Sequence, residues 1–291
     1  MQTTRSACRS RFRRAPRPPL IALVVPYRPQ AEQDRAAQLA AFLEHTARFL
    51  SASAAARFVV IVAQQSDDGR KFNRGALLNA GFREAQRLGI ASVVFHDVDV
   101  CEARRLGTLA SVIFHDVDLL PSAGLLRHYC APPARGECVH LAGAGAWSKY
   151  DLAGYADAFL GGVAAFQPDD FARCNGFPND YWGWGLEDDQ LRLRAAASGV
   201  RVVRPPAGAG RFDDLDELAL LGALNRPAER ARKRHLLNER FLELRGAPLP
   251  LDAGWSDENG LSGLVCAARE RRAQQLPGGV RCLHVVVELG R

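Results

Sequence analysis

The sequence lacks the features of several special classes of protein. It has no apolar run of the ~18 residues needed to cross a membrane, and its longest runs, such as 20–26 (LIALVVP), have the length of a strand, so no transmembrane helix is expected. Hydrophobic residues make up 47% and charged residues 24%, ordinary shares for a chain with a buried core. Composition therefore excludes intrinsic disorder as the main state, and it also excludes a collagen, a coiled coil and a small disulfide-rich scaffold.

Zinc-type cysteine spacing is missing as well. The chain has seven cysteines, an odd number, and none of them forms a C-x-x-C pair. Isolated buried thiols are therefore the main expectation. Cys130 with Cys138, and Cys266 with Cys282, could each close a short loop in an oxidising compartment, and the sequence establishes neither pairing.

Acidic residues are absent before Glu32, whereas residues 1–19 contain six arginines, a number equal to the formal net charge of +6. The basic charge is therefore a property of this segment and says little about the rest of the chain. We expect residues 1–19 to form a flexible basic tail that is similar to a transit segment, and we expect no nucleic-acid partner. The tail lacks the apolar stretch of a signal peptide, so the compartment stays open.

Apolar runs and helical spacing alternate along much of the chain. The expected elements, in chain order, are a strand over 20–26, a helix over 36–50, a strand over 57–63, a helix over 75–88, a strand over 91–95, a charged helix over 226–244 and a strand over 280–289. Strand–helix alternation predicts an α/β sheet with parallel strands at its centre.

The end of the third expected strand carries a motif that occurs twice. The stretch 84–99 (EAQRLGIASVVFHDVD) is followed by 102–118 (EARRLGTLASVIFHDVD), and the two HDVD copies lie 19 residues apart. Only one copy can occupy a given central strand, so the other is expected as an extra edge strand or an inserted loop. Ligands of α/β sheets bind outside the carboxyl ends of strands, which is where both HDVD copies lie.

Each copy places an Asp-x-Asp pair directly after an apolar strand. Such a pair can hold a divalent cation bound to a nucleotide-sugar diphosphate, because hard cations take oxygen ligands and the diphosphate supplies more of them. The apolar residue between the acids, Val117 in the second copy, is expected to point into the sheet. The competing interpretation is a solvated turn.

A second motif, 177–189 (FPNDYWGWGLEDD), combines aromatic rings, glycines and acids. Gly183 and Gly185 give the backbone unusual freedom, which indicates a mobile loop. The flat faces of Trp182 and Trp184 suit a sugar ring or a nucleotide. The acids Glu187–Asp189 begin an amphipathic helix, where they either form a simple cap that favours the helix dipole or provide a carboxylate base beside an aromatic sugar platform.

With these motifs, the chain resembles the beta-1,4-galactosyltransferase family (glycosyltransferase family 7), whose members are metal-dependent inverting glycosyltransferases. The resemblance spans about residues 20–290, and HDVDLLP and the ending GGVRCLHVVVEL are most similar to the xylosylprotein branch, which makes the proteoglycan linker. The matching segments, in family order, are 26–28 (PYR), 72–82 (FNRGALLNAGF), 115–121 (HDVDLLP), 161–163 (GGV), 175–177 (NGF) and 182–189 (WGWGLEDD).

The resemblance implies a single α/β domain of the glycosyltransferase-A type over residues 20–291, Rossmann-like, with a mixed and mainly parallel central sheet. It implies transfer of galactose from UDP-galactose to a hydroxyl of an acceptor sugar, with Mn²⁺ or Mg²⁺ as cofactor and a β-1,4 linkage as product. The acceptor would be the xylose of a proteoglycan linker or a related glycan. Family members lie in the Golgi lumen behind an N-terminal membrane helix, and no such helix is present in this sequence.

The resemblance also implies roles for individual residues. Asp188 would be the catalytic base, Glu187 would act with it by positioning hydroxyls, and Asp118 would bind the metal. The donor site would consist of Pro26, Tyr27, Arg28, Phe72, Arg74, Asp116, Gly161, Gly162 and Trp184. The acceptor site would consist of Trp184, Asp189, Phe159 and Tyr155.

Three departures from the family pattern stand out. The doubled HDVD gives two candidate metal residues; we favour Asp118 because only its copy continues as LLP, although the first copy has the family-like distance from Phe72. The family's His-x-His metal segment is replaced by Asp214 and Asp216, which either hold Mn²⁺ or Mg²⁺ or belong to an acidic surface loop. Phe159 stands where the family usually has a tyrosine that limits the donor's 2-substituent, and its bulk favours galactose.

Two other functions stay open at this point. The chain could be a transferase that uses UDP-N-acetylgalactosamine or another donor. It could also be a non-catalytic homologue that binds a sugar or a nucleotide, which the replaced histidines and the doubled strand would explain.

Overall fold

The computed structural model describes residues 17–30, 34–89, 108–143, 145–146, 159–215, 237–244 and 248–290. The elements, in chain order, are β1 (Leu20–Tyr27), α1 (Arg35–Ser51), β2 (Arg57–Gln65), α2 (Arg74–Gly89), β3 (Leu109–His115), β4 (Leu119–Pro121), η2 (Ala123–Leu125), α4 (Leu126–Cys130), β5 (Glu137–His140), β6 (Val163–Phe166), α5 (Pro168–Arg173), α6 (Glu187–Ala197), β7 (Arg201–Val203), β8 (Phe212–Asp214), α9 (Glu239–Leu244), β9 (Cys266–Gln275), η5 (Pro277–Gly279) and β10 (Arg281–Leu289).

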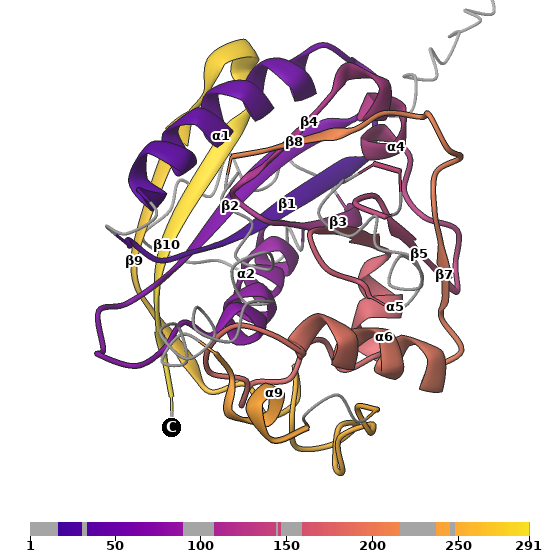
Figure 1. Ribbon diagram of the computed structural model, residues 1–291. Helices are drawn as coiled ribbons and strands as arrows, with labels where there is room; N and C mark the ends of the chain where they lie inside the picture. The colour runs from indigo at the N-terminus through magenta and orange to yellow at the C-terminus, as the bar shows by residue number, and fades with distance from the viewer. Residues whose placement is uncertain are drawn as a thin grey trace, which may run out of the picture.

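The described strands form an eight-stranded sheet in the order β7-β5-β6-β3-β1-β2-β10-β9, and β4 pairs with β8 in a separate ribbon. The four central strands, β3, β1, β2 and β10, run parallel to one another. Strand β6 pairs antiparallel with β3, and strand β9 pairs antiparallel with β10. Figure 1 shows β7 and β9 at opposite edges of the molecule. The predicted α/β class with a mixed, mainly parallel central sheet is confirmed.

The central strands are buried on both faces, as their continuous apolar sequences require. All eight residues of β1 are buried. Alternate residues of β1 point to opposite faces of the sheet: Leu20 and Val24 join the core under α2, while Leu23 joins the core under α1. The helices α1 and α2 therefore cover opposite faces (Figure 1). This layering leaves the carboxyl ends of β1, β2 and β3 free to form a site.

The second HDVD copy occupies a central strand. Its apolar part is β3, which pairs with β1 on one side and β6 on the other. The first copy, the predicted strand 91–95 and the basic tail up to residue 16 lie outside the described residues.

The predicted helix over 226–244 is confirmed over 239–244 and wrong at residues 237 and 238. Residues 226–236 lie outside the described part, and α9 begins only at Glu239. Leu237 is fully buried and forms an isolated parallel bridge with Trp184, and the next amide, of Asn238, donates to the Trp184 carbonyl at 3.0 Å. Pairing with the tryptophan segment therefore overrides the helical spacing of this sequence.

Three further features complete the comparison with the sequence. The edge strand β9 was not predicted, because its sequence CAARERRAQQ is largely charged and exposed and lacks an apolar face. All five cysteines in the described ranges, Cys130, Cys138, Cys174, Cys266 and Cys282, are free, so neither of the two possible pairings is formed. Within the same ranges, no helix is long and apolar enough to cross a membrane.

Gly81 sets the distance between α2 and β1 and yields a first prediction. A Cβ atom at this position would lie 2.3 Å from Cγ1 of Val24. We expect Gly81→Ala to lower the free energy of unfolding by about 1–2 kcal/mol, because the overpacking cost of ~1–3 kcal/mol exceeds the gain in helix propensity. Denaturant unfolding measures this change. Arg87→Ala, on the exposed face of the same helix, is the matched control and should change it by less than about 0.5 kcal/mol; equal effects would contradict the packing account.

Candidate functional site

A cavity of about 320 Å³ opens at the carboxyl ends of β1, β2 and β3. It brings together segments that are far apart in the sequence: the end of β1, the loop after β2, the start of α2, the second HDVD copy and the tryptophan segment. The predicted site residues that line it are Pro26, Tyr27, Arg28, Phe72, Arg74, Asp116, Asp118, Trp184 and Glu187.

Arg74, the first residue of α2, lies at the centre of this arrangement. Its Nε donates to Oδ1 of Asp116 at 2.7 Å, and its Nη1 donates to Oε1 of Glu187 at 3.3 Å. Burial alone would lower the pKa of Arg74, but the two carboxylates raise it above its ordinary value. One guanidinium therefore joins the end of β3 to the start of α6.

Local capping fixes the direction of Arg74. The side chain of Asn73 accepts a hydrogen bond from the backbone amide of Ala76 at 2.9 Å, which caps the N-terminus of α2. The amide of Asn73 in turn donates to Oε1 of Gln65, at the end of β2, at 2.9 Å. The helix is thus tied to the strand that precedes it, and its first residue points into the cavity.

The acids of the second HDVD copy and the valine between them all line the cavity. Val117 lies in a turn after β3, is buried and also packs in the core cluster under α1. Oδ2 of Asp118 accepts from Nη1 of Arg35 at 3.1 Å. The amide of Asp116 donates to the carbonyl of Gly162 at 3.0 Å, so the Gly-Gly segment is fastened to the end of β3.

The segment that carries the other predicted metal ligands runs beside Asp118. In the β4–β8 ribbon Leu119 pairs with Asp214, and the amide of Leu215 donates to the carbonyl of Asp118 at 2.7 Å. Asp216 lies outside the described residues. Within the described ranges no three metal-ligating side chains are gathered into one group. The carboxylate of Asp118 is a hard oxygen donor that already has a cationic partner, so its chemistry fits a divalent cation, with Asp214 as a neighbour.

Asp188 lies directly against Gly161. A Cβ atom on Gly161 would be only 2.2 Å from Oδ2 of Asp188, so only glycine leaves room for the carboxylate. The carbonyl of Gly161 is held by Nε2 of His140 at 2.9 Å, and Gly162 is held by Asp116. The predicted base therefore lies next to the end of β3.

The acids at the start of α6 are crowded: Glu187 is buried, and Asp188 and Asp189 are half-buried. Leu186 precedes the helix in the left-handed region, with φ of 78°, and this turn directs the acids inward. Burial, with the Asp188 carboxylate beside it, raises the pKa of Glu187 to about 7 although Arg74 opposes the shift. Burial and the same neighbour raise the pKa of Asp189 to about 8. One oxygen of Glu187, Oε2, is buried and has no hydrogen-bond partner among the described residues.

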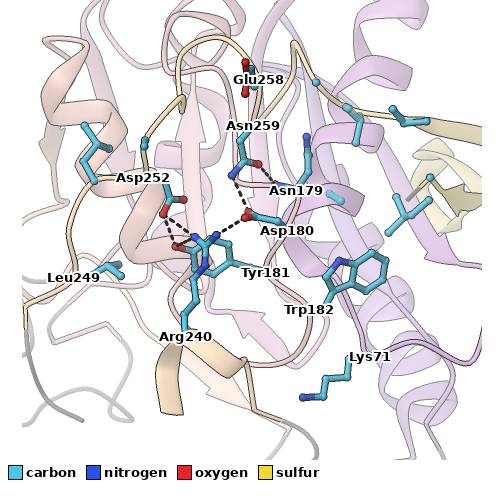
Figure 2. A pocket seen from close by; sticks show the side chains of 18 of the residues that line it. Lys71, Asn179, Asp180, Tyr181, Trp182, Arg240, Leu249, Asp252, Glu258 and Asn259 are labelled. Carbon is cyan, nitrogen blue, oxygen red and sulfur yellow. Dashed lines mark hydrogen bonds and ion pairs between the residues drawn. The ribbon is translucent and has the colours of Figure 1, made fainter. Parts of the chain in front are cut away.

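The two tryptophans line different cavities. Trp184 lines the 320 Å³ cavity. Trp182 lines a neighbouring cavity of about 1270 Å³ and packs under the guanidinium of Arg70, 4.2 Å from the ring centroid. Figure 2 shows this second cavity, with Arg240 bound to Asp180, Tyr181 and Asp252. Only one of the two predicted aromatic faces thus belongs to the HDVD site.

The predicted acceptor residues are only partly described. Phe159 is buried and packs edge-to-face on His140, with ring centroids 4.9 Å apart, beside Gly161. Asp189 follows Asp188 in the first turn of α6, and Tyr155 lies outside the described residues.

Three cationic residues of the cavity were missed by the sequence analysis: Arg35, Arg70 and Lys71. Arg35 begins α1 shortly after β1, and the other two follow β2. The rule that ligands bind at the carboxyl ends of parallel strands points to the segments that carry these residues, but no motif singles out the three side chains.

Family models and curated relatives match this chain. A family model described as the N-terminal region of glycosyl transferase group 7 matches residues 8–106, and one described as the N-terminal domain of galactosyltransferase matches residues 144–217. Xylosylprotein 4-beta-galactosyltransferase of Caenorhabditis elegans is 30% identical over 63% of this chain and 53% of that protein. Beta-1,4-galactosyltransferase 3 of Homo sapiens is 35% identical over 66% of this chain and 41% of that protein. The chain spans about half the length of these curated relatives.

Solved structures match nearly the whole chain. The catalytic domain of Drosophila beta1,4galactosyltransferase 7 in complex with xylobiose has a TM-score of 0.64 at 25% identity, covering 94% of this chain and 95% of that one. A mutant of that Drosophila protein in complex with manganese, UDP-Gal and xylobiose has a TM-score of 0.61 at the same identity and coverage.

The buried acid Glu187 yields a pH prediction. Its pKa is raised from 4.5 to about 7, so between these values the folded chain keeps a proton that the unfolded chain has lost. The free energy of unfolding should therefore fall as pH rises through this window, by roughly 1–3 kcal/mol for this one group. Glu187→Gln should flatten the profile in part, since Asp189 still titrates. Denaturant unfolding at several pH values measures this; Asp169→Asn, which alters an exposed acid, is the control. If the free energy of unfolding of Glu187→Gln fell as steeply with pH as that of the unaltered chain, the assignment of this titration to Glu187 would be contradicted.

Proposed function

The chain belongs to the beta-1,4-galactosyltransferase family and has the glycosyltransferase-A type fold, and we propose that it transfers galactose from UDP-galactose to a hydroxyl of an acceptor sugar with inversion, forming a β-1,4 linkage. One arrangement of residues carries this proposal. Arg74 binds both Asp116, at the end of β3, and Glu187, at the start of α6. Asp188, which follows Glu187, lies against Gly161, and the neighbouring Gly162 is hydrogen-bonded to Asp116. A carboxylate base and a nucleotide-sized cavity therefore meet at one edge of the sheet.

The donor would bind in the 320 Å³ cavity. The aromatic rings of Tyr27 and Phe72 line the cavity and suit the uracil base, and the guanidinium of Arg28 lies 5.7 Å from the Phe72 ring centroid. The cations around the cavity would face the negative diphosphate, and Asp116 would face the donor sugar or the ribose. Arg74 would hold that carboxylate in place rather than contact the phosphates itself.

The cofactor would be Mn²⁺ or Mg²⁺, held by Asp118 and, from the neighbouring β8, by Asp214, with Asp216 as the third carboxylate. A bound divalent cation would neutralise the charge that develops on the departing diphosphate. The Drosophila relative binds manganese and UDP-Gal, which supports this assignment.

Asp188 would act as the general base. A sugar hydroxyl is a poor nucleophile, so the carboxylate takes its proton while the oxygen attacks the anomeric carbon and the bond to UDP breaks on the opposite side. Help of this kind is worth about 10²–10⁴-fold in rate. The acceptor face would be built from Trp184, Asp189 and Phe159, with Glu187 positioning the donor hydroxyls and Trp184 excluding water.

The proposed acceptor is a β-xyloside. The similarity to the xylosylprotein 4-beta-galactosyltransferase of Caenorhabditis elegans and to the xylobiose-bound Drosophila structure supports it.

Replacement of the base tests the proposal. We expect UDP release from UDP-galactose to depend on a β-xyloside and on Mn²⁺, and to stop reversibly with a chelator. Asp188→Asn should lower the transfer rate by about 10²–10⁴-fold, with little change in UDP affinity, because only the proton acceptor is lost. Asp169→Asn, on the exposed side of α5, is the control and should keep full activity. UDP binding without turnover on any donor or acceptor would contradict the enzymatic proposal and favour a binding protein.

Gly161 offers a second, steric test. A methyl group at Gly161 would meet Oδ2 of Asp188 at 2.2 Å, so Gly161→Ala must push the base aside. A displacement of about 1 Å can cost on the order of 100-fold in rate, and we expect a loss of that size in kcat. Steady-state kinetics together with a melting curve measures the effect in folded protein. A Gly161→Ala variant with unaltered kcat would show that Asp188 does not act from this position.

A further inference from the structure

A histidine from another strand holds the segment against which the predicted base lies. His140 is the last residue of β5, where its backbone pairs with Ala164 of β6. Nε2 of its ring lies 2.9 Å from the carbonyl oxygen of Gly161. The same ring packs edge-to-face on Phe159, with ring centroids 4.9 Å apart. One side chain therefore contacts two residues of the segment 159–162.

The protonation state of His140 follows from its surroundings. A carbonyl oxygen only accepts hydrogen bonds, so Nε2 carries a proton and donates it to Gly161. The ring is fully buried. Burial lowers the pKa of His140 to about 4, and the positive charge of Arg204 acts in the same direction, although the hydrogen bond to Gly161 opposes both. At neutral pH the ring is therefore an uncharged, fixed hydrogen-bond donor.

Packing alone does not explain a histidine at this position. In the uncharged ring Nδ1 is an acceptor, and this buried atom has no hydrogen-bond partner among the described residues. An unpaired buried polar atom costs about 1–3 kcal/mol. The Gly161 carbonyl also accepts from the amide of Val163 at 3.0 Å, so it would stay paired without the ring. What histidine adds over an apolar side chain of similar size is the directed bond to Gly161.

That bond matters because Gly161 is in contact with Asp188. A Cβ atom on Gly161 would lie 2.2 Å from Oδ2 of Asp188, so the place of the carboxylate depends on where this residue is held. The carbonyl of the next residue, Gly162, accepts from the amide of Asp116 at 3.0 Å. His140 and Asp116 therefore hold two successive residues beside the predicted base.

We propose that His140 is a positioning residue of the transfer reaction, whose Nε2 proton holds Gly161 so that the carboxylate of Asp188 stays in place as the base. This role rests on the proposed function, because it concerns the base of the same reaction. His140 is not among the residues that line the 320 Å³ cavity, so it acts through Gly161 and not on the nucleotide. Its loss should lower kcat and leave donor binding unchanged.

Three substitutions separate the hydrogen bond from the packing of the ring. The amide nitrogen of glutamine can take the place of Nε2, that of asparagine takes the place of Nδ1, and leucine has no donor. His140→Leu and His140→Asn should lower kcat for galactose transfer to a β-xyloside by roughly tenfold, because a shift of about 1 Å can cost about 100-fold and this shift is smaller. His140→Gln should recover most of the loss. The KM for UDP-galactose, and the UDP affinity from calorimetry, should change by less than about twofold in all three.

A double variant tests whether His140 acts through the base. In an Asp188→Asn background, His140→Leu should lower the residual transfer rate by less than about twofold, because the group that it positions is gone. A loss as large as in the unaltered background would show that His140 acts on something other than Asp188, and would overturn the proposal.

His45→Leu is the matched control. Nε2 of His45 also lies against a backbone carbonyl, that of Pro121 at 2.8 Å, and its loss should leave kcat unchanged. If His140→Leu does not fold, the comparison of His140→Gln with His140→Asn, each checked by a melting curve, decides the question. A Gln variant as impaired as the Asn variant would overturn the role of the hydrogen bond.

The failure of this inference is distinct from that of the proposed function. If the unaltered chain transfers no galactose to any acceptor, the proposed function fails and this inference fails with it. If the unaltered chain is active and the folded His140 variants match its kcat, only this inference fails.

Discussion

The site depends on the ion pairs of the Arg74 guanidinium, whose side chain is only 14% exposed. It joins Asp116 to Glu187, which lie 42 and 113 positions after Arg74 in the chain. Three carboxylates, those of Asp116, Glu187 and Asp188, would repel one another in this buried region without a cation among them. Removing one partner from such a buried pair costs about 3–5 kcal/mol, so the cluster fixes both the geometry and its own charge balance.

Much of the fold could be predicted from the sequence, because the central strands are continuous apolar runs that are buried on both faces. The run LIALVVP predicted β1, and the spacing of Gly75–Leu88 predicted α2 to within one residue at each end. The helix predicted over 226–244 is wrong at Leu237 because this residue pairs with Trp184, a contact that no local pattern reveals. The edge strand β9 was not predicted, because charged residues protect its exposed face and remove the apolar alternation that marks a strand.

The site residues that belong to a sequence motif could be predicted. Those that reach the site only through the arrangement of the fold could not. Asp116, Asp118 and Trp184 follow from HDVD and WGWG, and they line one cavity. Arg35 has no motif of its own; it reaches Asp118 only because α1 starts beside the end of β1. Trp182, equal to Trp184 in the sequence pattern, lines the second cavity instead. Gly183, with a φ of 102°, turns the backbone between the two rings, which would share a side in an extended chain.

The central claim is that nucleotide and cation bind together in the cavity at the ends of β1, β2 and β3. A crystal structure of the full chain with Mn²⁺ and UDP, with the metal located by its anomalous scattering, tests it most directly. The account predicts a manganese peak within bonding distance of Asp118, the diphosphate beside it and uracil near Phe72. Nucleotide bound in the cavity beside Arg240 and Asp252, or manganese remote from Asp118, would contradict it.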